Sequence, residues 1–440
     1  VSGKLDGSGG AGSTWLAMAL GASPKAEFDI ARLSDGRFLF RDLLVDAQGL
    51  KVRGDGGRGL LGGLTFKGDA DLASIAGMRK GASGALSASW SAGQSGRGKP
   101  WGLDLDIKGA KLASGYAELD RLLGGQPRLS GKAEFSGGRI LVSEAVLTGA
   151  SGRMTAAGAR EADGALKFKL DWTAEGPFRA GPVEITGKAK GSGAITGTLQ
   201  APRADLIADI DALDVPRLPL TNARVVLSFL RRPDGSSGVV ALNASSAYGP
   251  AQAKSAFAFP GAGVDLTDLS VDAGGLKASG DLSLRDHAAS SADLDVSLIK
   301  GAFLEAGKVA GQVRLTDGVG GPRARLSLTA EGVALPGGRV VISSGRVSAD
   351  GPLSKLPYSA ELSGMFSGSR WGLDGSGTLA HAAPGYQLAF NGEGRYLKWA
   401  LKTVEAAQFR LGGPESSAKM QLVASDGGRI DVNARMARAS

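Results

Sequence analysis

Cysteine is absent from the 440-residue chain, and histidine occurs only at His287 and His381. The lack of cysteine excludes disulfides and thiolate metal sites. Two histidines in loop-like surroundings are too few for a histidine zinc site or a histidine-based catalytic triad, and the sequence patterns of P-loops and zinc proteases are absent. We therefore expect no metal, no cofactor and no catalytic residue, and we do not expect an enzyme.

Large apolar side chains and long apolar runs are also scarce. Aromatic residues make up 6% of the chain, and no stretch approaches the roughly 18 apolar residues of a membrane-spanning helix. The 51 lysines and arginines exceed the 43 acids, giving a net charge of +8, but both signs are interspersed along the chain. Interspersed charges are typical of a solvated outer face, so we expect no nucleic-acid partner.

Glycine, with 70 residues, is the abundant type. At this abundance, the two matches to the dinucleotide-binding glycine pattern, at 7–12 and 54–59, are expected by chance. A chain rich in glycine and poor in large side chains does not easily build one thick core. Thin sheets suit this composition better.

Alternation of apolar and polar residues dominates the sequence. Examples are ALKFKLDWTA (165–174), RADLIADIDAL (203–213) and RVVISSGRVSA (339–349), with glycine-rich turn signals between such runs. Alternation of period two indicates strands with one dry and one wet face, and strands at short, regular spacing predict an all-β fold. Helical signals are confined to one or two short segments, 114–125 and 13–22.

Internal repeats suggest how these strands are organised. Residues 202–216 align without gaps with 322–336, and 42–54 with 268–280, but the spacing between copies is not constant. The repeats resemble a drifting hairpin pattern, and a lone hairpin is marginally stable at best. We expect the hairpins to stand side by side in a long twisted sheet, antiparallel or mixed. Residues 1–440 would form a single elongated domain without a sharp internal boundary, a piece of a longer chain.

The repeats also resemble a known family. Segments 20–56 and 122–158, with 197–229 and 351–362, are similar to the TamB proteins of Gram-negative bacteria, the inner-membrane component of the translocation and assembly module and part of the AsmA-like group. The motifs are individually degenerate, but as a texture they cover essentially the whole chain. The resemblance implies a β-sheet curled into a taco-like trough with an apolar inside and a polar outside.

The resemblance also carries functional expectations. It implies a periplasmic segment that moves phospholipid between the inner and outer membranes and supports assembly of outer-membrane proteins. The family's inner-membrane helix and barrel-contacting domain have no counterpart in this sequence. We therefore expect that the membrane anchor and the contact with an outer-membrane barrel partner lie outside this segment, and that the segment is a monomer. No catalytic residue carries over.

The dry faces of the strands are the candidate functional site. Their light side chains leave room for acyl chains, and each buried CH₂ contributes about 0.8 kcal/mol through non-directional contact that permits sliding. The candidate lining residues are Phe38, Phe40, Phe168, Leu170, Leu206, Ala208, Ile210, Val225, Leu227, Leu326, Leu328, Ala330, Val340 and Ile342.

Three other interpretations stay open at this level. The same side chains could pack between two layers of sheet. The repeats could form a structural β-solenoid, such as a surface adhesin or secreted passenger segment, although solenoids keep a short fixed period that is missing here. The chain could also offer sheet edges to unfolded strands of outer-membrane proteins.

Overall fold

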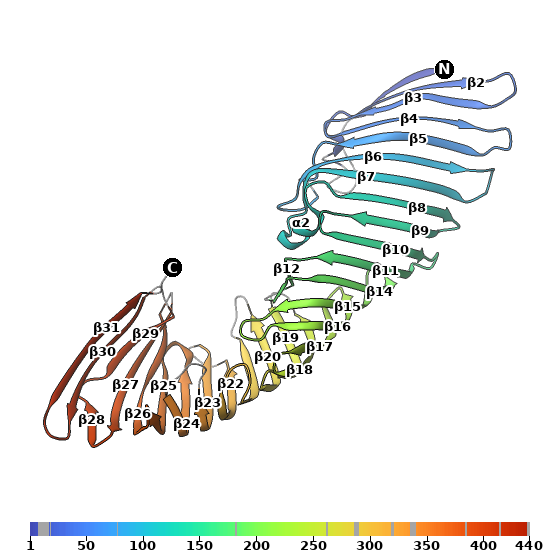
Figure 1. Cartoon of the computed structure of the whole chain (residues 1–440). Coiled ribbons are helices and arrows are strands. Elements are labelled where there is room, and N and C mark those ends of the chain that lie inside the picture. The colour runs from blue at the N-terminus through green and yellow to red at the C-terminus, as the bar shows by residue number, and fades with distance from the viewer. Residues whose placement is uncertain are drawn as a thin grey trace. The chain divides into compact units, whose positions relative to one another are not determined.

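The chain folds almost entirely as β-strands. The structure is a computed structural model that describes residues 1–7, 17, 19–76, 78–180, 183–260, 263–285, 290–317, 321–334, 340–382, 385–412 and 415–437. These residues form 31 strands, helix α2 (Ala117–Leu123) and the 3-10 turn η1 (Leu353–Lys355). Figure 1 shows the strands and helix α2. The predicted all-β class and the short helix within 114–125 are confirmed. The second expected helix, over 13–22, falls largely outside the described residues.

The strands divide between two compact units. Residues 1–215 and 221–233 form the first unit, and residues 216–220 and 234–440 form the second. The strands of the first unit are β1 (Ser2–Asp6), β2 (Lys25–Arg32), β3 (Phe38–Asp46), β4 (Leu50–Arg58), β5 (Leu64–Leu72), β6 (Ser83–Gln94), β7 (Trp101–Ala113), β8 (Arg128–Ser136), β9 (Arg139–Thr148), β10 (Gly152–Arg160), β11 (Ala165–Glu175), β12 (Phe178–Ala180), β13 (Val183–Ile185), β14 (Lys188–Thr198), β15 (Pro202–Asp214) and β16 (Leu220–Arg232).

The second unit continues the same hairpin succession. Its strands are β17 (Gly235–Ser246), β18 (Gly249–Phe259), β19 (Gly263–Ala273), β20 (Leu276–Arg285), β21 (Ser291–Ile299), β22 (Ala306–Thr316), β23 (Arg323–Ala334), β24 (Val340–Pro352), β25 (Leu356–Phe366), β26 (Ser369–Ala382), β27 (Gly385–Tyr396), β28 (Trp399–Thr403), β29 (Ala407–Leu411), β30 (Glu415–Ala424) and β31 (Arg429–Ala437).

Within the first unit the strands form an antiparallel meander. Each strand from β1 to β11 pairs with the next along the chain, and β14 then lies between β11 and β15. The short strands β12 and β13 extend the β11–β14 hairpin after an interruption at 176–177 and 186–187. Sequential hairpins of this kind need only short turns, which the frequent glycines supply.

The second unit repeats the meander. Strands β17 to β27 pair in chain order and antiparallel. Strands β28 and β29 both pair with β27, each with a different part of it. Strand β30 then pairs with both β28 and β29, and β31 pairs with β30. Every pairing among the described strands is therefore antiparallel, the first of the two predicted options.

One sequence repeat marks a β-bulge. Asp42 and Asp268, which begin the aligned segments 42–54 and 268–280, have positive φ angles of 50° and 52°. The strand register shifts at both positions, between Phe40 and Leu43 and between Leu266 and Leu269. Aspartate tolerates the left-handed region better than most residues. The extra residue of the bulge changes which side chains beyond it project to each side of the sheet. The repeat is thus a bulged hairpin, found once in each unit.

The interior of the sheet is thin. Among the described residues no large side chain falls below 2% exposure, and the most deeply buried residues are alanines such as Ala223 and Ala251, each at 1%. In each unit, strands in substantial contact are neighbours in the sheet. Most apolar side chains on the strands are half-buried and few are fully buried, which favours an open face over packing between two sheet layers.

Candidate functional site: the apolar faces of the two units

The strand register identifies which side chains share a face. Directly opposed residues of an antiparallel pair project to the same side of the sheet, and successive residues of one strand project to opposite sides. A row of opposed residues can therefore be followed from strand to strand across each unit.

In the second unit, the row through Leu328 is apolar across ten strands. From β17 to β26 its members in register are Leu242, Ala253, Val271, Ala278, Val296, Gly311, Leu328, Val347, Ala360 and Gly375. No charged residue interrupts this row. Because each strand contributes one apolar residue, the row forms a continuous track perpendicular to the strands.

Two parallel tracks flank it. The row through Leu326 contains Leu294, Val313, Leu326, Ala349 and Tyr358, and the row through Ala330 contains Leu276, Leu298, Val309, Ala330, Gly345, Leu362 and Leu373. Most of these side chains are half-buried. We call this surface of the second unit its apolar face.

The opposite side of the same strands is polar. The row through Ser327, one residue from Leu328, contains Ser279, Asp295, Gln312, Ser327, Ser348, Ser359 and Ser376. The hydroxyls of Ser348 and Ser359 lie 2.7 Å apart in a hydrogen bond across the strands. The two faces of one strand thus differ completely in chemistry.

The first unit has an apolar face of the same design. The row through Phe168 runs from β3 to β15 and contains Phe40, Gly56, Phe66, Ala92, Leu103, Ala133, Val142, Gly158, Phe168, Ile195 and Ala204. The next row contains Trp90, Leu105, Gly131, Ala145, Ala156, Leu170, Gly193 and Leu206. Together they define the apolar face of the first unit.

The structure places each predicted lining residue on one of these two faces. The register puts Phe38, Phe40, Phe168, Leu170, Leu206, Ala208 and Ile210 on the first apolar face, and Leu326, Leu328, Ala330, Val340 and Ile342 on the second.

Val225 and Leu227, on β16, are placed by their neighbours. The Arg224 guanidinium contacts Asp209 at 3.0 Å, and the Ser228 hydroxyl donates to Asp205 at 2.6 Å. Asp205 and Asp209 belong to the polar side of β15, so alternation along β16 puts Val225 and Leu227 on the apolar side. These two residues therefore extend the first apolar face.

Glycines form the floor beneath the large side chains, a feature that the sequence analysis missed. A methyl group added to Gly375 would lie 2.5 Å from the Phe390 ring, and one on Gly345 would lie 2.7 Å from Leu362. The Phe390 ring and the Leu362 side chain therefore lie across glycines of neighbouring strands, as aromatic residues do when they cover strand glycines. This arrangement gives the apolar faces low relief.

Aromatic side chains bridge strands on the first apolar face in the same way. The ring centroids of Phe40 and Phe66 are 5.5 Å apart on either side of Gly56, and those of Phe66 and Trp101 are 6.4 Å apart and nearly parallel. Both separations fall within the range of favourable aromatic pairs. The pairs fill space laterally within the face.

Charged residues on the polar side pair across strands. The Arg128 guanidinium donates to both carboxylate oxygens of Asp106, at 2.7 and 2.8 Å, and its hydrogen bond lowers the pKa of Asp106. The hydrogen bond from Arg325 likewise lowers the pKa of Asp350, with an Nη2–Oδ2 distance of 2.8 Å. Bidentate and charge-assisted hydrogen bonds of this type hold neighbouring strands in register. The charged groups that form them keep this side of the sheet polar and solvated.

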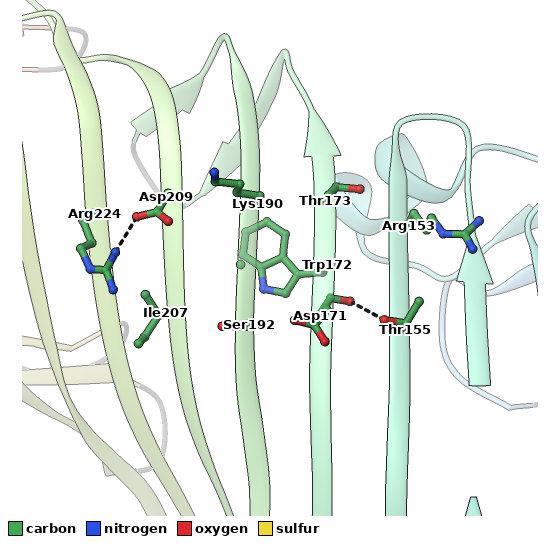
Figure 2. A pocket seen from close by; sticks show the side chains of 11 residues that line it. Arg153, Thr155, Asp171, Trp172, Thr173, Lys190, Ser192, Ile207, Asp209 and Arg224 are labelled. Carbon is green, nitrogen blue, oxygen red and sulfur yellow. Dashed lines mark hydrogen bonds and ion pairs between the residues drawn. The ribbon is translucent and has the colours of Figure 1, made fainter. Parts of the chain in front are cut away.

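Hollows of the described structure open on the polar side. Figure 2 shows one of about 450 Å³ in the first unit, lined among others by Arg153, Lys190 and Arg224. A second, of about 670 Å³ in the second unit, has Glu361 and Arg346 in its lining. The first hollow also contains Trp172 and Ile207, and long charged side chains line both hollows, which suits water and small ions.

The hollows lack the geometry of a metal or catalytic centre. Within the described ranges, no group of three histidine, aspartate or glutamate residues could hold a metal ion. His381 lies against Tyr386, with ring centroids 5.5 Å apart, and His287 is outside the described residues. No helix of the described part is long and apolar enough to cross a membrane.

The two broad apolar faces are therefore the distinctive surfaces of the chain. Their curling into a trough stays a prediction. No family model, curated protein or solved structure matches the chain, so its resemblance to the TamB proteins also stays a prediction from the sequence.

Proposed function

We propose that the chain carries phospholipid acyl chains along its apolar faces, as a non-enzymatic segment of a lipid-transfer bridge between two membranes. The observation that supports this most strongly is the continuity of the apolar rows, which cross strand after strand without a charged residue. Exposed apolar surface on this scale marks an interaction site.

The energetics suit a mobile apolar ligand. Each CH₂ removed from water contributes about 0.8 kcal/mol, and the contact has no preferred direction. Successive positions along the Leu328 row differ only in apolar side-chain size, so neighbouring binding positions are close in energy. A chain can then shift by one strand spacing, about 4.8 Å, without breaking a polar contact.

The low relief of the faces supports transport over tight, specific binding. Because side chains such as Leu362 and Phe390 lie across glycines, the described part of each face has low relief at these positions. A binding site for a single ligand normally encloses most of that ligand's surface. A shallow face accepts acyl chains of differing length and saturation.

The cellular setting of the proposal comes from the sequence resemblance. We place the segment in the periplasm, between inner and outer membranes, where it would support outer-membrane protein assembly as a monomer. Its anchor and its contact with an outer-membrane barrel would be made by other regions of a longer protein. The paired charges of the polar side, such as Arg128 with Asp106, suit a solvated exterior better than a nucleic-acid interface.

A structural β-solenoid is the competing function. Solenoids stack short rungs of fixed length into a closed cross-section. The described pairings instead join consecutive strands as antiparallel hairpins, for example β22 with β23 and β23 with β24. This topology favours the transfer segment over the solenoid.

Photocrosslinking tests the proposed function. A photoreactive amino acid in place of Leu328 should form adducts with phospholipid acyl chains, detected by mass spectrometry of protein purified from membranes. The same residue in place of Ser327, one position along β23 but on the polar side, should not. Equal labelling at the two positions, or none at Leu328, would show that the apolar face does not hold lipid.

A further inference from the structure

Two neighbouring hairpins of the second unit end in a cluster of aromatic and aliphatic side chains. The turns β25–β26 and β27–β28 lie together, since the Leu397 amide donates to the Arg370 carbonyl at 3.3 Å. The rings of Phe366 and Tyr396 have centroids 6.1 Å apart. We call the cluster the aromatic tip and define it as Phe366, Trp371, Tyr396, Leu397 and Trp399.

The rings of the aromatic tip belong to the apolar face. Trp371, Tyr396 and Trp399 follow one another in register across β26, β27 and β28, in the same row as Gly364 and Ile342. Phe366, two residues beyond Gly364, projects to the same side. The apolar face thus reaches the end of these strands as a patch of rings, in a chain with only five tyrosines and six tryptophans.

Three members of the aromatic tip are strongly exposed. Leu397 is 65% exposed, Phe366 41% and Trp399 39%. Leu397 lies at the turn itself, where its φ angle of 56° would suit glycine or asparagine better than leucine. Large apolar side chains grouped at a hairpin end cost solubility, and such a patch indicates a contact made with another surface.

Three cations lie at these two turns, with Lys398 beside the Trp399 ring and with Arg370 and Arg395 on the polar side of the strands. Segments 362–373 and 394–404 contain no acidic residue, and among the described residues none of Arg370, Arg395 and Lys398 forms an ion pair. The Lys398 ammonium lies 5.4 Å from the centre of the Trp399 ring. The turn between β30 and β31, residues 425–428, carries one acid, Asp426, whose carboxylate accepts the Gly428 amide.

We propose that the aromatic tip docks on a lipid bilayer that contains anionic phospholipids. Tryptophan and tyrosine favour the headgroup level of a membrane, where their rings are buried and their polar atoms stay wet. Arginine and lysine beside them bind the phosphates of anionic lipids. The combination of exposed rings, an exposed leucine and unpaired cations fits this surface in both polarity and charge.

This docking does not depend on lipid transport along the apolar faces. The tip could hold the chain at a membrane even if no acyl chain travels along the row of Leu328. Conversely, acyl chains could occupy that row in a chain without the tip. The two proposals can therefore fail separately.

The absence of cysteine makes a site-specific test direct. Leu397→Cys introduces the only thiol, which can carry an environment-sensitive fluorophore, NBD. Tyr248→Cys is the matched control, because Tyr248 is 54% exposed at the β17–β18 turn of the same unit and residues 243–253 carry no charge. The probes are vesicles of phosphatidylcholine alone and of phosphatidylcholine mixed equally with phosphatidylglycerol.

We expect a blue shift and higher emission from the label at Leu397 with the mixed vesicles, and no change from the label at Tyr248. Failure of the Leu397 label to respond, or an equal response from both labels, would overturn the proposal. A response to phosphatidylcholine vesicles as strong as that to mixed vesicles would refute the part assigned to the cations.

Substitutions in the unlabelled chain separate the two contributions. Arg370→Gln with Lys398→Gln should weaken vesicle binding by roughly fivefold for each charge removed. Leu397→Ser should weaken it about tenfold, because an aliphatic side chain no longer leaves water. Tyr248→Ser should leave binding unchanged. Unchanged binding by the Leu397 variant, with photocrosslinking at Leu328 retained, would refute the docking site and leave the proposed transport standing.

Discussion

Leu328→Asp is the most direct perturbation of the proposed transport. Leu328 lies in the middle of β23, between Gly311 and Val347 of the adjoining strands, and the rows on either side of it are apolar. A carboxylate at this position has no cation on its own face among the residues in register. Any acyl chain that crosses β23 along this track would lie against an uncompensated charge.

The size of the effect follows from two contributions. Contact with a leucine side chain is worth about 1.5–3 kcal/mol, and burying a polar group without a hydrogen bond costs at least about 2 kcal/mol. Together they amount to roughly 4 kcal/mol, which lowers acyl-chain occupancy at β23 about a thousandfold. Because the track is continuous, one such position should reduce passage along the whole row.

Ser327→Asp is the matched control. It adds the same charge one residue away on the same strand, but on the polar side, in a row of serines. Both substitutions carry the same weak strand preference of aspartate, at most about 1 kcal/mol. Thermal unfolding of the two variants should verify that each retains the sheet.

The assay compares phospholipid co-purified per chain and the exchange of fluorescent phospholipid between vesicles. We expect Leu328→Asp to lose both and Ser327→Asp to resemble the unmodified chain. If a folded Leu328→Asp chain holds and exchanges as much lipid as Ser327→Asp, the apolar face does not carry the lipid and the reasoning is refuted.

Three further predictions concern stability. Gly311→Ala should lower the free energy of unfolding by about 1–3 kcal/mol, because the added methyl meets Leu328 and the Ser327 carbonyl. Gly394→Ala, whose added methyl would have its nearest neighbour at 3.6 Å, should raise the free energy of unfolding by up to about 1 kcal/mol. Urea unfolding of both variants measures the two changes. Ala251→Leu, at a position only 1% exposed, should lower the melting temperature through overpacking, and an unchanged value would contradict the burial. The pKa of Asp350 is lowered by Arg325, so its stabilising effect is complete above the unfolded pKa of about 3.9 and is lost as pH falls through the lower folded pKa; Asp350→Asn should remove this part of the acid dependence of the urea midpoint.

The faces of the strands could be predicted from the sequence because alternation alone determines them. Leu326, Leu328 and Ala330 occupy every second position of β23, and a shift of one residue would turn all three to the polar side. The side of the sheet to which each residue projects is therefore strongly specified, even where the apolar side chains are small. The same reasoning placed the aromatic residues Phe38, Phe40 and Phe168 correctly relative to the polar residues beside them.

Other features require the pairing of distant strands. Alternation breaks between Phe40 and Leu43, and only the bulge at Asp42 explains why both residues keep the same side. The aromatic tip gathers Trp371 and Trp399 from strands whose neighbours the sequence does not reveal. The sequence analysis considered glycines as turn signals, but many other glycines lie within strands beneath large side chains.

The ordering of strands in each unit has a consequence for folding. The strands that make extensive contacts are close neighbours along the chain. One hairpin can therefore form before any segment distant in the sequence is in place. Stability in such arrays approximates a sum of nearest-neighbour contributions. Each unit can then assemble progressively from any starting hairpin, and a damaging substitution should open its own hairpins in hydrogen exchange while those further along stay protected.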